Sequence, residues 1–200
     1  MGKTAVIFPG IGYHCDKPLL YYSSKLAANH GYDIIRITYP EFPINLKEAT
    51  EEQLMEFLEM GIKRTEEILG NSLQCDDSQI LFISKSIGTA VATAYAARHL
   101  NSASQSNLID ATNITADNPV RHILFTPLEL TFKYAAPSCG IAFNGTKDNW
   151  ADWNRVADLC TQKNIPLMTL PGANHSLETG QPLTDIKNLH EVMEAVEKTL

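Results

Sequence analysis

The sequence is short of positive charge. Its 200 residues include 16 lysines and arginines against 23 aspartates and glutamates, which gives a formal net charge of −7 at pH 7. Proteins that bind nucleic acid need basic surfaces to neutralise phosphates, and anionic membranes attract basic segments. We therefore expect neither nucleic acid nor membrane among the partners of this protein.

Long hydrophobic runs are also missing. No apolar run approaches the ~20 residues that a membrane-spanning helix needs. The first ten residues, MGKTAVIFPG, contain one lysine and then an apolar run that is too short for the core of a signal peptide. This stretch therefore predicts a first strand rather than an export signal, and we expect a cytoplasmic protein.

Cysteine is scarce, and its spacing indicates no metal site. The four cysteines are Cys15, Cys75, Cys139 and Cys160. They form no CxxC pair and no cluster with histidine, and cytoplasmic thiols are reduced by default. Gly10 and Gly12 have no third glycine at the spacing of a dinucleotide-binding loop, and no Walker pattern is present. We therefore expect neither a metal nor a cofactor.

Strand-like and helix-like segments alternate along the whole chain. The six predicted strands are residues 5–8, 34–38, 80–83, 122–125, 140–143 and 166–170. These runs are almost continuously apolar, which is typical of strands covered on both faces in a parallel sheet. We therefore predict one α/β domain over residues 1–200, with an open, mostly parallel six-stranded sheet and helices on both faces.

The predicted helices have recognisable ends. Pro18 and Gly31 mark the start and the end of one helix. Thr50 and Gln53 form a predicted capping box at the start of another, which Gly70 ends.

Two later helices are predicted from their apolar spacing. One runs from about residue 148 to 163, with Trp150 and Trp153 facing inward. In the last helix, Ile186 begins the stripe of apolar residues that should face the core. A polar stretch at 101–118 is predicted to be a surface loop at the amino ends of the strands.

The stretch SKSIGT places Ser86 between a predicted strand and an alanine-rich helix. Small residues flank it two positions away on each side, Ser84 and Gly88, as a tight strand-to-helix turn requires. Ser86 could simply cap the helix. Alternatively, the turn presents its hydroxyl as a nucleophile beside the N–H groups of the helix amino end.

Loops after two later strands supply partners for such a nucleophile. His175 follows the sixth predicted strand in PGANHS, and Asp148 follows the fifth in NGTKD. A histidine oriented by a carboxylate is the base that activates a serine. Asp148 could instead cap a helix, Glu129 is the alternative acid, and Asp152 is a weaker candidate.

An oxyanion hole would need two N–H donors. The residue after the nucleophile, Ile87, supplies the first. The glycine-rich loop after the first predicted strand, PGIG, lets the backbone approach a ligand closely. We predict Ile11 as the second donor, with Gly12 as the alternative.

These loops together resemble the α/β-hydrolase family over nearly the whole chain. FPGIG is similar to the family's oxyanion loop, SKSIGT to its nucleophile elbow, and the order serine, aspartate, histidine is the family's own. The elbow departs from the family pattern at Ser84 and Thr89, where glycine is common. The resemblance implies that Ser86 is the nucleophile, Asp148 the orienting acid and His175 the base.

The resemblance also implies a small hydrolase without a lid. The stretch TPLELTFKYAAPSC, where the family inserts caps, is too short for a helical cap. We therefore expect an open site for a small or medium acyl ester or thioester. The alternatives are a peptidase, acyltransferase or lyase on the same fold, or a binding protein without catalysis.

Five residues are candidates for the lining of the substrate pocket. They are Tyr13, His14, Lys85, Leu128 and Trp150. Lys85 could meet an anionic group of a substrate, but a lysine exposed to solvent is the favoured interpretation.

Overall fold

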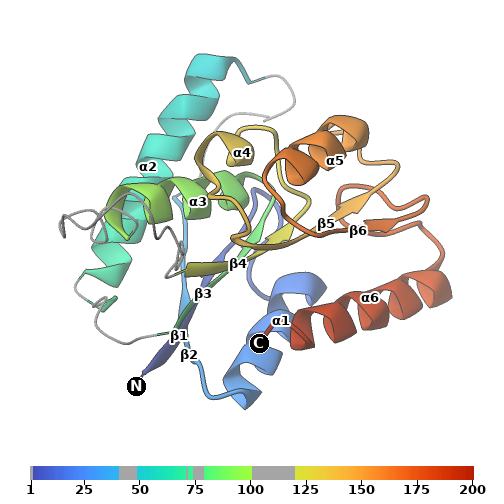
Figure 1. The fold of residues 1–200 in the computed structure, drawn as a ribbon, viewed down its shortest axis with the longest axis horizontal. Helices are drawn as coiled ribbons and strands as arrows, with labels where there is room; N and C mark the ends of the chain where they lie inside the picture. Colours follow the sequence, from blue (N-terminus) through green and yellow to red (C-terminus); the bar gives the residue numbers. More distant parts are fainter. Residues whose placement is uncertain (1, 41–48, 71, 74–78, 101–119) are drawn as a thin grey trace, which may run out of the picture.

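The described residues form a single sheet of six parallel strands in the order β2-β1-β3-β4-β5-β6 (Figure 1). The computed structural model describes residues 2–40, 49–70, 72–73, 79–100 and 120–200. Cys75 and the predicted loop at 101–118 lie outside these ranges. The strands are β1 (Lys3–Phe8), β2 (Asp33–Arg36), β3 (Gln79–Lys85), β4 (Val120–Phe125), β5 (Gly140–Gly145) and β6 (Leu167–Leu170). The predicted fold class is confirmed.

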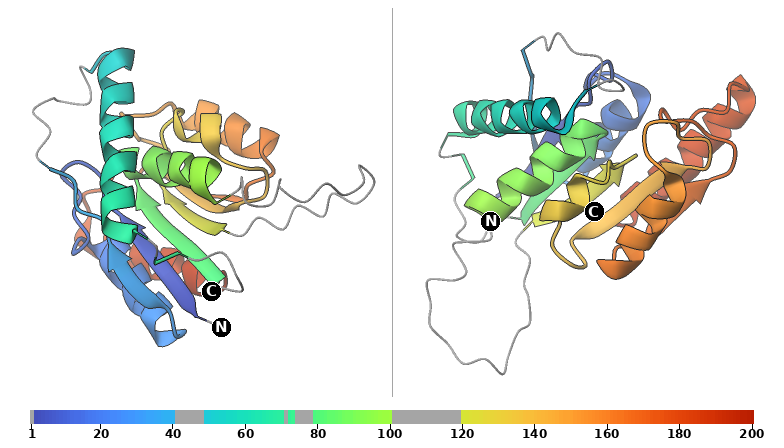
Figure 2. Two further views of the ribbon diagram at one scale, coloured as in Figure 1. Left: turned by 90° about the vertical axis from the view of Figure 1, so that its left-hand side faces the viewer. Right: turned by 90° about the horizontal axis from the view of Figure 1, so that it is seen from above.

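Helices cover both faces of this sheet (Figures 1 and 2). Helices α1 (Pro18–Asn29) and α6 (Pro182–Glu197) pack together on one face. The opposite face carries α2 (Glu51–Leu69), α3 (Ile87–His99), α4 (Thr131–Tyr134) and α5 (Trp153–Gln162). The strands between the two helical layers are therefore buried on both sides, which explains their continuous apolar runs.

The predicted helix ends are present. The side chain of Thr50 accepts a hydrogen bond from Gln53 N, and the side chain of Gln53 accepts one from Thr50 N. Pro18 begins α1, and Gly31 follows its end with a φ of 84°. The short helix α4 was not predicted, because four residues are too few for a helical period.

Three predictions about the later helices were wrong. Helix α5 begins at Trp153, because Asp152 caps it by accepting from Asn154 N. Trp150 therefore lies in the preceding loop and is 37% exposed. Ile186 is 65% exposed, since α6 packs on the core through its second half, where Val192 and Val196 are buried.

The order of the strands creates a crevice at the carboxyl end of β1. The chain leaves β1 for β2 on one side and returns to β3 on the other side. The strand order therefore reverses at β1, and open α/β sheets bind their ligands outside the carboxyl ends of the strands at such a point.

The first turn of α3 packs closely against the end of β1. A Cβ atom added to Gly88 would lie 2.3 Å from the carbonyl oxygen of Pro9 and 2.7 Å from that of Phe8. Backbone atoms in a sheet cannot move aside as a flexible side chain can. Position 88 therefore admits only glycine without a shift of the helix.

Gly88→Ala is expected to lower the free energy of unfolding by at least about 2 kcal/mol, because the added methyl group forces α3 away from β1. Urea denaturation followed by circular dichroism measures this change. Gly2→Ala is the matched control, since nothing lies within 4 Å of a Cβ atom there. A loss of equal size in both variants would contradict the argument from close packing.

Candidate active site

Ser86 lies at the junction of β3 and α3 in a conformation that L-residues rarely adopt. Its φ is 55° and its ψ is −128°. Its N–H donates to Phe125 O over 2.9 Å, and its carbonyl oxygen accepts from Thr89 N over 2.9 Å. The backbone is thus held from both sides. Such strained positions cluster at functional sites because the surrounding structure must maintain them.

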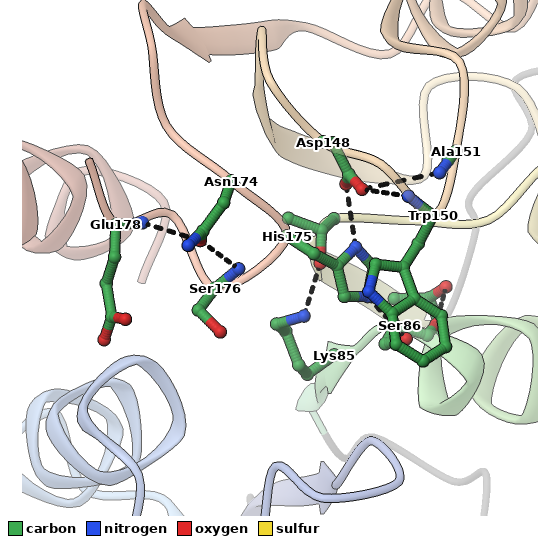
Figure 3. Close-up of polar contacts among 11 residues, drawn as sticks. Lys85, Ser86, Asp148, Trp150, Ala151, Asn174, His175, Ser176 and Glu178 are labelled. Carbon is green, nitrogen blue, oxygen red and sulfur yellow. Dashed lines mark hydrogen bonds and ion pairs between the residues drawn. The ribbon is translucent and has the colours of Figure 1, made fainter. Parts of the chain in front are cut away.

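The hydroxyl of Ser86 does not cap the helix. Ser86 occupies the N-cap position of α3 but makes no side-chain capping hydrogen bond. Its Oγ lies 2.8 Å from His175 Nε2 instead (Figure 3). The interpretation of Ser86 as a helix cap is therefore wrong.

His175 and Asp148 complete a row of hydrogen bonds. His175 Nδ1 lies 2.8 Å from Asp148 Oδ2, and the side chain of Asp148 is 0% exposed. The other carboxylate oxygen accepts from Trp150 N over 2.8 Å and, more weakly, from Ala151 N (Figure 3). Asp148 therefore shapes its own loop while one oxygen faces the imidazole.

The alternative acids point elsewhere. Glu129 pairs with Arg155 over 3.6 Å, and both side chains are about half exposed. Asp152 accepts from the backbone at the start of α5. Of the three carboxylates considered from the sequence, Asp148 is the one that contacts His175.

The loops that carry the acid and the histidine meet at Gly145. A Cβ atom at Gly145 would lie 2.2 Å from Ala173 O. Within the histidine loop, Asn174 Oδ1 accepts from the N–H groups of Ser176 and Glu178 (Figure 3). These contacts fix the loop that carries His175.

The indole of Trp150 covers the imidazole ring. The centroids of the Trp150 and His175 rings are 5.4 Å apart, and the ring planes differ by 24° (Figure 3). A stacked aromatic face restrains the ring orientation and attracts the positive charge of an imidazolium. The sequence pointed to Trp150 as a pocket residue but gave no sign of this stacking.

The turn after β1 runs beside the serine. Gly10 and Tyr13 exchange two backbone hydrogen bonds of 3.1 Å, which leaves Ile11 and Gly12 at the tip. A Cβ atom at Gly10 would lie 3.1 Å from Ser86 Cβ, so the turn passes close to the serine.

Two of the predicted oxyanion donors, Ile11 and Gly12, belong to this turn, and the third, Ile87, directly follows Ser86. Gly12 has a φ of 72°, which suits a tight turn. On the other side, the N–H of Ile87 belongs to the first turn of α3, where N–H groups have no partner within the helix. The roles of Ile11, Gly12 and Ile87 as donors stay predictions.

Two cavities bounded by described residues lie beside loops of the candidate site, one at the turn after β1 and one at the loop of Trp150. The first, of about 810 Å³, is lined by Gly10, Ile11, Gly12, His14 and the end of β2. The second, of about 450 Å³, is lined by Leu128, Trp150 and residues of their loops. His14, Leu128 and Trp150 thus line these cavities, and their roles in a substrate pocket stay predictions.

Tyr13 lines neither of these cavities. Its hydroxyl accepts from Leu19 N over 3.1 Å, and its ring belongs to the core beneath α1 and α6. Burial raises the pKa of Tyr13 to about 12. Tyr13 lines a third cavity, of about 190 Å³, together with residues of α1 and α6, and its role in a substrate pocket stays a prediction.

Lys85 is buried, so its interpretation as a solvated lysine was wrong. Only 1% of the residue is exposed, and its Nζ donates to Thr126 Oγ1. Burial lowers the pKa of Lys85 from 10.5 to about 7, and the negative charge of Asp148 opposes this shift. The two-residue period of a strand places Lys85 on the face of Leu81 and Ile83, a signal that was present in the sequence.

Three of the four cysteines are described, and all three are buried thiols without a disulfide: Cys15, Cys139 and Cys160. Burial raises the pKa of Cys139 to about 11 and that of Cys160 to about 12. Among the described residues, no group of three or more His, Cys, Asp or Glu side chains could hold a metal ion. No described helix is long and apolar enough to cross a membrane.

Lys85→Met is expected to raise the free energy of unfolding near pH 6, because methionine has similar length and carries no desolvation penalty. The gain should shrink as the pH rises. Between about pH 7 and 10.5 the unfolded state binds more protons than the folded state, so the wild type gains up to about 1.4 kcal/mol per pH unit from this group.

Urea denaturation of both proteins from about pH 6 to about pH 9 tests this expectation. Lys147→Met is the matched control, because Lys147 is exposed and its removal should give a difference that changes little with pH. A difference between wild type and Lys85→Met that is constant with pH would show that the lysine is not desolvated.

Comparison with known proteins gives matches in structure only. No family model and no curated protein matches the sequence. An α/β serine hydrolase homologue from Coxiella burnetii superimposes with a TM-score of 0.61 and 13% identity, covering 100% of this chain and 85% of that chain.

Two further structures agree with this match. A serine hydrolase without a lid, from Xanthomonas campestris, gives a TM-score of 0.62 at 12% identity, with coverage of 98% and 80%. Esterase PE8 gives 0.63 at 13% identity, with coverage of 100% and 93%. At sequence identities this low, the structural matches establish the architecture alone. Together with the parallel sheet and the elbow at Ser86, they confirm that this chain has the α/β-hydrolase fold.

Proposed function

We propose that this protein is a serine hydrolase that cleaves small or medium acyl esters or thioesters. The observation that carries the proposal is the unbroken row of two 2.8 Å hydrogen bonds from Ser86 through His175 to Asp148. A serine, a base and an orienting acid in this geometry are the parts that acyl transfer requires.

In the proposed reaction, His175 Nε2 takes the proton of Ser86 Oγ while this oxygen attacks the acyl carbonyl carbon. Asp148 accepts from Nδ1–H and stabilises the imidazolium. When the tetrahedral intermediate collapses, its bond to the leaving group breaks, and the alcohol or thiol takes the proton from His175. Water then attacks the acyl-enzyme by the same route, which releases the carboxylic acid and restores Ser86.

Backbone donors would stabilise the negative charge on the carbonyl oxygen. We expect these donors to be the N–H group of Ile87 and that of Ile11, or of Gly12 in its place. A donor of this kind contributes about 3 kcal/mol in the transition state. The amino end of α3 adds its dipole in the same sense.

The surroundings of the serine favour small or medium substrates. Between β4 and β5 the chain forms only the four-residue helix α4, so no helical cap is inserted there. One cavity borders the turn after β1 and the other borders the loop of Trp150, and we expect them to receive the acyl part and the leaving group. The complete row of hydrogen bonds argues against the alternative of a binding protein without catalysis.

A fluorophosphonate probe is expected to label wild-type protein at Ser86, because an activated serine attacks phosphorus as it attacks a carbonyl carbon. Mass spectrometry of the peptides locates the label. Ser86→Ala and His175→Ala should abolish labelling. Ser138→Ala is the control, since this exposed serine lies at the opposite end of the sheet. Folded wild-type protein that resists the probe would contradict the proposal.

Asp148→Asn is expected to lower kcat for p-nitrophenyl acetate by about four orders of magnitude, because an amide can fix the wrong tautomer of the imidazole. Steady-state kinetics near neutral pH measures the loss. Asp158→Asn, a change at an exposed position of α5, should leave the rate within about twofold. A loss below tenfold in Asp148→Asn would remove Asp148 from the mechanism.

A further inference from the structure

Lys85 is a buried cation directly before the proposed nucleophile. Two neutral groups contact it: Nζ donates to Thr126 Oγ1 and lies 5.1 Å from the ring centroid of Tyr13. Figure 3 shows the side chain rising from the end of β3 toward the region of His175. A charged group inside a protein is costly unless something nearby stabilises it, so its retention here calls for a physical explanation.

The partner of this lysine is itself held in a strained backbone conformation. Thr126 has a φ of 42°, which is uncommon for a β-branched residue, and its N–H donates to Phe143 O over 2.8 Å. Thr126 follows β4 as Ser86 follows β3, and these strands are neighbours. Two adjacent strands therefore end in strained residues, one carrying the hydroxyl nucleophile and the other the acceptor for Lys85.

Ionisable groups from two loops, Tyr13 and Asp148, act on Lys85, and a third loop is connected to it through Asp148. Tyr13 follows β1 and Asp148 follows β5. His175, which follows β6, is hydrogen-bonded to Asp148. Burial raises the pKa of Tyr13 to about 12, with a smaller contribution from the charge of Glu178, so the phenol stays neutral. Burial lowers the pKa of Lys85, and the negative charge of Asp148 partly offsets this shift. The charge of Lys85 therefore interacts with Asp148 and, through Asp148, with His175.

We propose that Lys85 is a positioning residue whose buried ammonium acts on Asp148 and thereby lowers the proton affinity of His175. Part of the negative charge of Asp148 is balanced by the ammonium, so less of it stabilises an imidazolium. The ammonium also repels the imidazolium directly. His175 then remains neutral, and able to take the proton of Ser86, at a lower pH than it would otherwise.

The charge on Lys85 is expected to change near neutral pH. Burial lowers the pKa of Lys85 to about 7, so the ammonium persists where an ordinary histidine titrates and is lost above that range. The two groups therefore titrate as a coupled pair. The catalytic consequence rests on the proposed function, in which His175 is the base, whereas the coupling itself can be measured without turnover.

Nuclear magnetic resonance of the histidine rings tests the coupling directly. The signals of His175 are assigned by their loss in His175→Ala and then followed with pH. Lys85→Met should raise the titration midpoint of His175 by on the order of one pH unit. Lys147→Met removes an exposed charge next to Asp148 in sequence, and screening by water should leave the midpoint unchanged.

Thr126→Val is a second variant that keeps the lysine. Valine has the shape of threonine but no acceptor for Nζ, so Lys85 should lose its proton more readily. The midpoint of His175 should then rise by less than in Lys85→Met. In both variants the acidic limb of kcat/KM should move to higher pH by the same amount as the resonance midpoint, which a purely structural role would not produce.

The proposal is overturned if the His175 midpoint in Lys85→Met stays within about 0.2 pH units of wild type. It is equally overturned if Lys147→Met moves the midpoint as far. Probe labelling separates the two proposals. A shifted His175 midpoint without labelling of Ser86 would contradict the serine hydrolase function and support the coupling between Lys85 and His175. Labelling of Ser86 with an unmoved midpoint keeps the hydrolase and rejects the role of Lys85.

Discussion

The close approach of α3 to β1 is the contact on which the site depends. Because Gly88 has no side chain, the first turn of α3 rests against the carbonyl groups of Phe8 and Pro9. This contact places Ser86 and the turn after β1 side by side. A second close approach, of Gly145 to Ala173, joins the acid loop to the histidine loop. Two glycines thus bring together four segments that are distant in the sequence.

The core offsets the strain and buried charge that gather at one edge of the sheet. Below that edge, apolar side chains from both helical layers pack on the strands. At the edge itself, Ser86 and Thr126 adopt positive φ, and Lys85 and Asp148 are buried. Each strained residue costs about 1–3 kcal/mol, an amount that the burial of a few large apolar side chains offsets. The strained backbone and the buried charges are therefore tolerated because the rest of the fold is a well-packed apolar core.

Much of the architecture could be predicted because local signals agreed with the global fold. Six apolar runs gave six strands, and Thr50 with Gln53 gave a helix start. The order of Ser86, Asp148 and His175 could be predicted because each follows a strand, and parallel strands end at one edge. The structure then brings the three side chains within hydrogen-bonding distance.

The errors arose where packing decides what a residue does. Lys85 was interpreted by its charge, although its register with Leu81 and Ile83 placed it on a buried face. The strained Thr126 carries no local signal, since its conformation is imposed by its neighbours. Ile186 fits the apolar stripe of α6, yet that part of the helix meets no partner among the described residues of the core.

The proposed site is divided between two parts of the chain. The serine and the oxyanion donors lie before residue 100, whereas the acid and the base lie after residue 140. The hydrogen bonds that join them span 89 and 27 residues of sequence. Contacts of such separation require that distant parts of the chain meet, and the closure of the intervening chain makes them slow to form. A nascent chain that has reached residue 100 carries the proposed nucleophile without its proposed base, so the proposed site can assemble only after residue 175 has been synthesised.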